Sequence, residues 1–312
     1  MEMKTHRIRC RQMGSDFELG VIHHSSKIAN EILQSGIAEI QRIEALLTEF
    51  KPDSITSQVN REAGQHPVEV PAEFFSLMER CQALHRMTMG NFDITVRPLK
   101  KLYSFQNQHF EMPSPSSVTR ALESVGTDKI KLNKEKQTVS FEHPAMEIGF
   151  AAIGKGYASE RVATLWKKEG VESAYVNASG DLKAFGLTEK GENWKIGIAN
   201  PDQPGQPLFY IPLSNAAAAT SGDYEQFFMH QNIRYSHNID PKTGFPLKGM
   251  KSVTVLSPSA ELSDALATAL YVMGPEKGMH FVQHLPETHC IMVDDRNHIF
   301  FSEQLEYEEV HS

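Results

Sequence analysis

The chain has 312 residues, enough for a large buried core, and a formal net charge of −8. An apolar fraction of 40% beside 22% charged residues excludes a disordered chain and is typical of an enzyme-sized globular protein. The acidic excess is spread along the sequence, so we expect no nucleic-acid partner, which would need a clustered basic surface. Cys10, Cys81 and Cys290 are too widely spaced for a disulfide framework or a recognised metal motif.

The N-terminal residues 1–13 contain no apolar run of the length that a signal peptide or a membrane span requires. We therefore expect no transmembrane segment and a cytoplasmic location, unless a signal has been removed from the chain.

In the first half of the chain, alternating apolar positions predict a strand over residues 8–22, with Phe17, Leu19 and Val21 on one face. Apolar residues at intervals of three and four predict a long helix over residues 26–50. The further elements expected here are a short helix or loop at 54–60, a helix at 71–89, a polar turn with a strand-like piece at 90–99, a short helix at 118–125, weak strands at 129–133 and 137–141, and a helix that ends near 169.

In the second half, the patterns predict several short strands and two helices. The strands are expected at 174–177, 182–186, 194–199, 208–212, 252–256, 289–293 and 299–301, and the helices at 263–273 and 275–285. No internal repeat and no long linker marks a domain boundary. Long helices interleaved with antiparallel-looking strands favour an α+β fold.

A polar segment over residues 219–246 is the first candidate site. Its two ends, 219–224 and 235–246, contain four Ser or Thr hydroxyls, two carboxylates, His237, two glycines and two prolines, a mixture that we expect in loops rather than in a core element. Asp240 before a proline predicts a turn, and Gly244 supplies a position without a Cβ. This segment alone fits a loop-borne site and a solvated hairpin equally well.

Three further constellations have both a chemical and a structural interpretation. Lys155 between two glycines at the start of a helix fits either a phosphate site or a tightly packed helix start. Asp264 and Thr268, four residues apart on a helix, offer oxygens to a hard cation, but such residues also serve the helix dipole or face solvent. Asp93 either binds a ligand or caps a turn. The sequence lacks the usual hydrolase, zinc-protease and dinucleotide-binding motifs.

Taken in order, these pieces resemble the FAD:protein FMN transferase family, also called ApbE or flavin transferase. The matching pieces span positions 13 to about 270 and are residues 13–15, 50–60, 90–99, 153–158, 176–182, 220–224, 236–246 and 263–270. The resemblance implies a single ApbE-like α+β domain over residues 1–312, with mixed, largely antiparallel sheets and packed helices.

The resemblance also implies an activity and a set of site residues. Enzymes of this family move the FMN half of FAD onto a threonine of a target flavoprotein and release AMP, with Mg²⁺ beside the pyrophosphate. By position, the metal ligands are Asp264, Thr268 and the carbonyl of Ala152, and the candidate catalytic residues are His237 and Lys155. The FAD-binding positions that the resemblance implies are Met13, Asn91, Phe92, Asp93, Lys155 and Ile239, with Thr220, Ser221 and Gly222 as a wall of the cleft.

One departure from the family pattern bears on flavin affinity. Gly149 stands where an Asp is usual, six residues before the lysine, and Glu147 would replace that Asp only if its loop shifts. Two alternative functions therefore stay open: a metal-dependent FAD pyrophosphatase that yields FMN and AMP, and a non-catalytic FAD-binding protein. Many relatives are exported lipoproteins, whereas this sequence has no lipobox.

Overall fold

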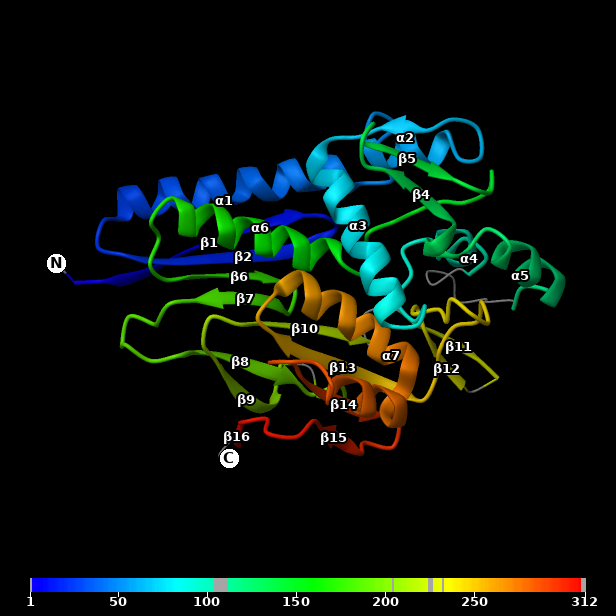
Figure 1. The fold of residues 1–312 in the computed structure, drawn as a ribbon. Helices are drawn as coiled ribbons and strands as arrows, with labels where there is room; N and C mark the ends of the chain where they lie inside the picture. Colours follow the sequence, from blue (N-terminus) through cyan, green and yellow to red (C-terminus); the bar gives the residue numbers. More distant parts are fainter. Residues whose placement is uncertain (1, 104–111, 204, 224–226, 232, 310–312) are drawn as a thin grey trace.

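The computed structural model describes residues 2–103, 112–203, 205–223, 227–231 and 233–309 (Figure 1). Its main sheet has eight strands in the order β1-β2-β6-β7-β10-β13-β14-β15, and each pairing between these described strands is antiparallel. The strands are β1 (Lys4–Gln12), β2 (Ser15–His23), β6 (Ala174–Ala178), β7 (Asp181–Phe185), β10 (Ala217–Gly222), β13 (Met250–Ser257), β14 (His289–Asp294) and β15 (Ile299–Phe301). The predicted α+β class is confirmed.

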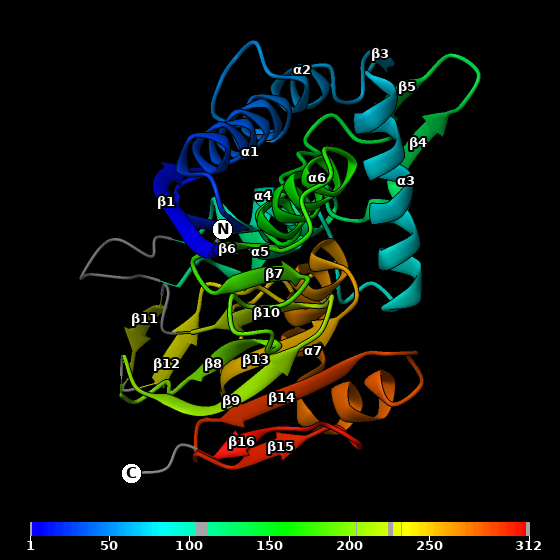
Figure 2. The same cartoon turned by 90° about the vertical axis from the view of Figure 1, so that its left-hand side faces the viewer.

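Three helices cover one face of the main sheet. They are α1 (Ser26–Leu47), α6 (Gly154–Lys168) and α7 (Ala260–Val282), which lie side by side in this order (Figures 1 and 2). The smaller helices are α2 (Ile55–Arg61), α3 (Ala72–Met87), α4 (Arg97–Lys100), α5 (Pro115–Leu122) and the 3₁₀ turn η1 (Thr127–Lys129). Among the described residues, no helix is long and apolar enough to cross a bilayer.

The remaining strands form three small sheets. They are β3 (Val68–Glu69), β5 (Thr138–Phe141) and β4 (Ile130–Asn133); β16 (Glu308–Glu309), β9 (Pro207–Leu213) and β8 (Trp194–Ala199); and the hairpin of β11 (Phe227–His230) with β12 (Ile233–Ser236). The second of these sheets packs on the main sheet through buried residues such as Phe209 and Ile211 against Leu182 and Ala184. The main sheet is therefore covered by helices on one face and partly by strands on the other.

The strand predicted over residues 8–22 is a hairpin. Phe17, Leu19 and Val21 do form the buried face of β2, as the alternation predicts. However, Met13 and Gly14 both have left-handed φ angles, of 52° and 71°, which turn the chain between β1 and β2. Two-residue turns of this kind match the twist of an antiparallel pair, so one predicted strand becomes two.

The prediction that residues 219–222 lie outside the core is wrong. They belong to β10, which pairs with β13 along its whole length and with β7 at Ala217 and Ala218. Ala217, Ala218 and Ala219 are buried, and α7 packs on this strand, whereas Ala218 faces the core cluster on the opposite side of the sheet. The polar side chains that follow are accommodated because each hydroxyl finds a partner, as described below.

Three other local predictions are settled by the structure. Residues 90–99 contain no strand, because the chain turns at Gly90 and then forms α4. Residues 55–61 form a helix, α2. The two helices predicted after residue 263 are confirmed: they are the two segments of α7, which starts at Ala260 and is interrupted at Gly274, where φ has a non-helical value of 74° immediately before Pro275.

Candidate functional site

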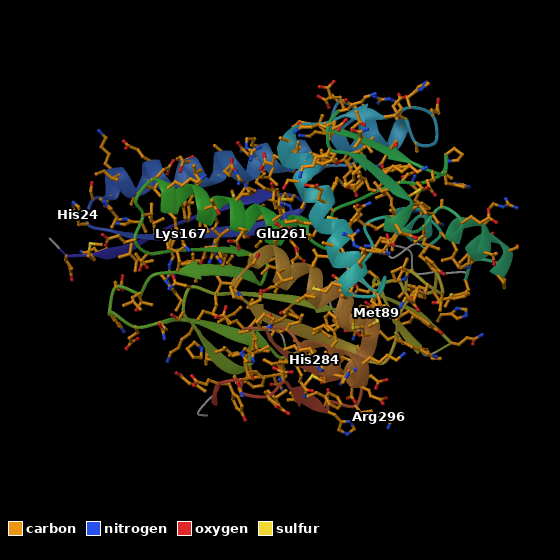
Figure 3. All side chains as sticks on the ribbon, in the orientation of Figure 1. His24, Met89, Lys167, Glu261, His284 and Arg296 are labelled. Atoms are coloured by element: carbon orange, nitrogen blue, oxygen red, sulfur yellow. The ribbon has the colours of Figure 1, made fainter. Side chains whose placement is uncertain are left out.

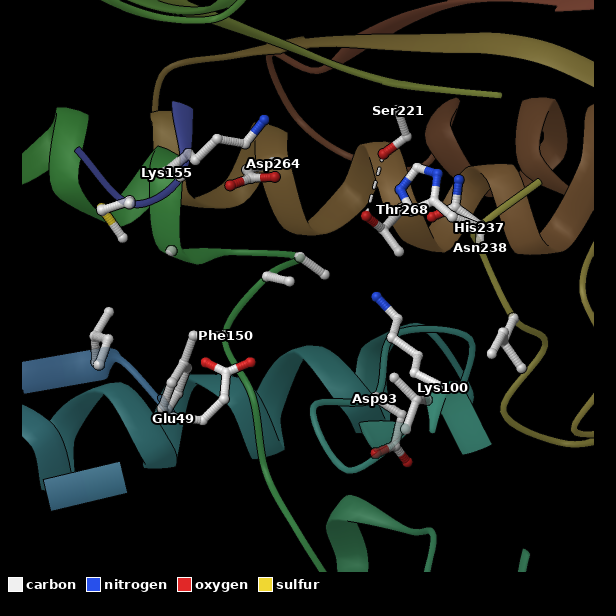
Figure 4. Close-up of a pocket in the computed structure, with 18 of the residues that line it drawn as sticks. Glu49, Asp93, Lys100, Phe150, Lys155, Ser221, His237, Asn238, Asp264 and Thr268 are labelled. Carbon is white, nitrogen blue, oxygen red and sulfur yellow. Dashed lines mark hydrogen bonds between the residues drawn. The ribbon is translucent and has the colours of Figure 1, made fainter. Parts of the chain in front are cut away.

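A cavity of about 560 Å³ brings together most of the residues that the sequence singles out. It lies where the end of α1, the start of α6, the end of β10 and the middle of α7 meet (Figure 4). The predicted site residues that line it are Met13, Asn91, Asp93, Ala152, Lys155, Thr220, Ser221, His237, Ile239, Asp264 and Thr268. These positions are up to about 250 residues apart in sequence, so the fold assembles them.

Two predicted binding residues do not line this cavity. The side chain of Phe92 is fully buried in the core beside α3, and Gly222 pairs with Ser252 within the main sheet. Both are next in sequence to a residue that lines the cavity, but neither of them faces the cavity. Tyr224, the last residue of the matching piece at 220–224, lies outside the described residues.

Asp264 is buried and lies in the second turn of α7. It is therefore neither a first-turn residue nor a solvated one. Its Oδ2 accepts a hydrogen bond from the backbone N–H of Gly156 at 2.9 Å. A Cβ at residue 156 would lie 2.2 Å from the carbonyl oxygen of Ala260, so only glycine lets α6 approach α7 this closely. The tightly packed helix start is therefore the correct interpretation of the glycine beside Lys155.

Lys155 is held at the cavity wall by an ion pair. Its Nζ lies 2.7 Å from Oδ2 of Asp181, a residue of β7 whose side chain is 3% exposed. The other oxygen of Asp181 accepts a hydrogen bond from the N–H of Thr220 at 3.0 Å. Asp181 thus fixes both the ammonium group and the strand β10. Sequence reasoning missed Asp181, although it stands within the matching piece at residues 176–182.

The hydroxyl groups at the cavity wall are joined in pairs. Ser221 Oγ and Thr268 Oγ1 are 3.1 Å apart, and Thr220 Oγ1 and Thr254 Oγ1 are 2.8 Å apart. Figure 4 shows His237 beside the pair of Ser221 and Thr268. A hydroxyl group, a carboxylate and an imidazole are therefore exposed to the same space along α7.

A rigid hairpin after β12 positions His237. The N–H of Ser236 bonds the carbonyl of Leu247 at 2.8 Å, and Ile239 pairs with Pro246. At the tip, Oδ1 of Asp240 accepts the backbone N–H two residues on at 2.9 Å, as the sequence predicts. Gly244 has a φ of 75°, and a Cβ there would meet Val118 Cγ1 at 2.6 Å.

Asp93 is mainly a structural residue. Its two oxygens accept hydrogen bonds from Thr95 and Thr127, at 2.5–3.0 Å, and Nδ1 of His85 lies 3.3 Å from Oδ2. Burial disfavours the Asp93 carboxylate, but the hydrogen bonds from His85 and Thr95 outweigh burial and hold its pKa below the usual value. The turn-capping interpretation is therefore the one that its contacts support.

The sequence reasoning missed three cavity residues that come from the turn after α1 and from α4. Phe50 is 80% exposed, and the guanidinium of Arg97 lies 5.3 Å from its ring centroid. Lys100 and Glu49 also line the cavity. Burial lowers the pKa of the Lys100 ammonium, and the charge of Glu49 opposes that shift. With Lys155, Lys100 gives the cavity two cationic groups, which suits an anionic ligand.

The donors around Asp264 fit a magnesium ion that is shared with a ligand. Among the described residues, no group of three or more His, Cys, Asp or Glu side chains could hold a metal ion on its own. The expected ligands that line the cavity are the carboxylate of Asp264, the hydroxyl of Thr268 and the backbone of Ala152, and the carboxylates of Glu44, Glu49 and Asp93 line it as well. Mg²⁺ commonly takes one or two carboxylates and completes its shell with substrate phosphates and water.

Comparison with known proteins gives one consistent result. A sequence model of the ApbE family matches residues 13–292. The FAD:protein FMN transferase of Haemophilus influenzae is 30% identical over 295 residues, which cover 90% of this chain and 84% of that protein. That of Klebsiella pneumoniae is 29% identical, with 93% and 89% covered.

Solved structures agree with the sequence comparison. The ApbE protein of Thermotoga maritima superposes with a TM-score of 0.87 at 28% identity and covers 96% of this chain and 97% of its own. The flavinyl transferase ApbE of Pseudomonas stutzeri gives 0.85 at 25% identity, with 97% and 96% covered.

Proposed function

The chain belongs to the ApbE family and is an FAD:protein FMN transferase, and on that premise we propose that it moves FMN onto a threonine hydroxyl of an acceptor protein in a Mg²⁺-dependent reaction. The observation that carries this proposal is the cavity in which Lys155, His237, Asp264 and Thr268 face one space. The acceptor is a flavoprotein whose target threonine reaches that space.

The transfer is a displacement at phosphorus. The threonine oxygen forms a bond to the phosphorus of the FMN half, the bond from that phosphorus to the bridging oxygen breaks, and AMP leaves with the electron pair. Negative charge grows on the phosphate oxygens during this step. The Lys155 ammonium, fixed by its ion pair with Asp181, is preorganised to stabilise that charge without moving.

Asp264, Thr268 and the carbonyl of Ala152 would hold Mg²⁺ together with the pyrophosphate of FAD. When bound, the cation neutralises charge on the pyrophosphate and makes AMP a better leaving group. Burial of Asp264 and its bond from Gly156 keep the carboxylate in one orientation.

His237 is the proposed proton acceptor for the threonine hydroxyl. An imidazole is the side chain that exchanges protons most readily near neutral pH. The hairpin bonds on either side of it restrict its backbone, and Figure 4 shows its ring directed toward Thr268.

We also infer that residues 1–312 form a single domain. Strands from both ends of the chain, β1 at Lys4 and β15 at Phe301, belong to the same sheet.

The direct test incubates the purified chain with FAD, MgCl₂ and candidate acceptor flavoproteins. We expect a flavin-fluorescent acceptor band that survives denaturation, an equal amount of AMP, and loss of both in EDTA. An acceptor whose target threonine is replaced by alanine is the control. Release of FMN and AMP without a labelled acceptor would identify a pyrophosphatase, and FAD binding without AMP would identify a non-catalytic flavin-binding protein.

A further inference from the structure

A groove lies next to the cavity, across the far end of α7. We call it the basic groove, and it is lined by Met89, Asn91, Asp240, Lys242, Val272, Met273, Lys277, His280, Phe281, His284 and Leu285. Figure 3 labels two of these residues, Met89, which follows α3, and His284, which follows α7. The groove encloses about 710 Å³, comparable to the cavity itself.

The groove and the cavity are adjacent. Asn91 and Val272 line both of them. On α7, Asp264, Thr268 and Val272 follow one another at intervals of four residues, so they form one face of the helix along the cavity. Beyond the kink at Gly274, the same helix lines the groove. A chain lying in the groove would therefore be led toward the candidate magnesium ligands.

Charge and exposure fit an acidic polypeptide. Lys242 and Lys277 are exposed cations, and His280 and His284 add positive charge when protonated. The carboxylate of Asp240 already accepts hydrogen bonds within its own turn.

The floor of the groove is partly apolar. Met89 is 67% exposed, and Phe281 and Leu285 are half-buried beside it. Apolar contacts between cationic groups suit a peptide segment better than a free anion, because a segment supplies both side-chain carbons and charges.

We propose that the basic groove binds the acceptor protein through an extended, acidic segment next to its target threonine. This proposal rests on the proposed transferase function, since it assigns the route by which the acceptor hydroxyl reaches the flavin phosphate. FAD fills the cavity in that reaction, so the acceptor needs a second surface that opens into it.

The test uses peptides and does not require turnover. The probe is a fluorescent peptide of about twelve residues with one central threonine flanked by Asp and Glu, and its control has Lys at the same places. We expect the FAD-loaded wild-type chain to bind the acidic peptide and the double variant Lys277→Glu, His284→Glu to bind it at least tenfold more weakly. Lys134→Glu, an exposed lysine between β4 and β5, is the matched control and should bind like wild type.

Three results would overturn the proposal: equal binding of both peptides, unchanged affinity in the double variant, or binding of anionic lipid vesicles in place of the peptide. FAD affinity, measured by flavin fluorescence, should be the same in all variants. AMP release is followed in parallel with an acceptor flavoprotein. A wild-type chain that binds the peptide but releases no AMP would disprove the transferase proposal and leave the groove assignment standing.

Discussion

The carboxylate of Glu49 occupies the space beside Gly149. Its Oε1 lies 3.2 Å from the position that a Cβ at residue 149 would take, and it accepts a hydrogen bond from Arg97 at 3.1 Å. Glu147 is not placed to substitute there: it pairs with Arg97 and Lys101 and is not among the cavity-lining residues. A carboxylate thus faces the cavity at this point although residue 149 is a glycine, and it comes from the turn that follows α1.

We predict that Gly149→Asp weakens FAD binding by about tenfold, or about 1.4 kcal/mol. The new carboxylate would meet the carboxylate of Glu49 at contact distance, and like charges this close repel each other and displace the cavity wall. Titration of flavin fluorescence measures the affinity.

Gly149→Asn is the matched control for this prediction, because it adds the same volume without the charge and should bind FAD more tightly than Gly149→Asp. Adding Glu49→Gln to Gly149→Asp should recover most of the affinity. If the Asp and Asn variants bind equally well, charge repulsion with Glu49 is not the cause.

We predict that Asp264→Asn lowers Mg²⁺-dependent transfer about 100-fold or more and that added MgCl₂ restores little of it. The amide can still accept the N–H of Gly156, so the melting temperature should change little. Asp264→Ala is a poorer probe, because it leaves that buried N–H without its acceptor, at a cost of about 1–3 kcal/mol. Wild-type activity in the Asn variant would remove Asp264 from the magnesium site.

We predict that His237→Asn slows transfer about 100-fold while the affinity for FAD stays within about twofold. If His237 accepts the threonine proton, the rate of the variant should also lose the rise with pH that a titrating base produces. The pH dependence of kcat, compared with Ser236→Ala, separates this role from a structural one, since the Ser236 hydroxyl holds the hairpin by accepting the N–H of Asn238 and by a hydrogen bond with Tyr271.

Local chemistry explains which features the sequence could predict. The alternation at Phe17, Leu19 and Val21 reports a strand buried on one face, and it does so without any partner strand. The turn at Asp240 and Gly244 was predictable for the same reason: the side-chain bond and the left-handed φ involve only residues inside the turn.

Pairings between distant residues explain what the sequence could not predict. The hydroxyls of Thr220 and Ser221 suggest a loop until their partners, Thr254 and Thr268, are known, since a buried hydroxyl is acceptable once it is bonded. The importance of Gly156 likewise depends on Ala260, about a hundred residues later. The candidate site residues came from a family resemblance, which brings such distant pairings with it. Glu49 and Lys100 lay outside the matching pieces, and Asp181, inside one of them, was not singled out because its partners Lys155 and Thr220 are distant in sequence.

We predict that Lys155→Met costs about 2 kcal/mol of stability in addition to abolishing transfer, because it leaves the buried Asp181 carboxylate without its ion pair. The double variant Lys155→Met, Asp181→Asn should regain most of the stability and none of the activity. Denaturant unfolding measures the first effect and AMP release the second. If Lys155→Met and the double variant have the same free energy of unfolding as wild type, the ion pair serves catalysis alone.

The last prediction concerns the pair of His85 and Asp93, whose side chains are 15% and 2% exposed. The hydrogen bond to Asp93 raises the pKa of His85 above 6.5, and the pKa of Asp93 is held below 3.8. The contribution of His85 to stability is therefore complete below pH 6.5 and is lost as pH rises through its raised pKa. The contribution of Asp93 is complete above pH 3.8 and is lost as pH falls through its lowered pKa.

Both contributions are present together between about pH 4 and pH 6.5. The free energy of unfolding of wild type should therefore exceed that of His85→Asn by about 1 kcal/mol near pH 5 and by clearly less at pH 9, where His85 is neutral. Urea unfolding at both pH values measures the difference, with the exposed His66→Asn as a control that should show none. A gap that is constant or grows with pH would mean that His85 acts through packing alone, because only its protonated form gains from the Asp93 charge.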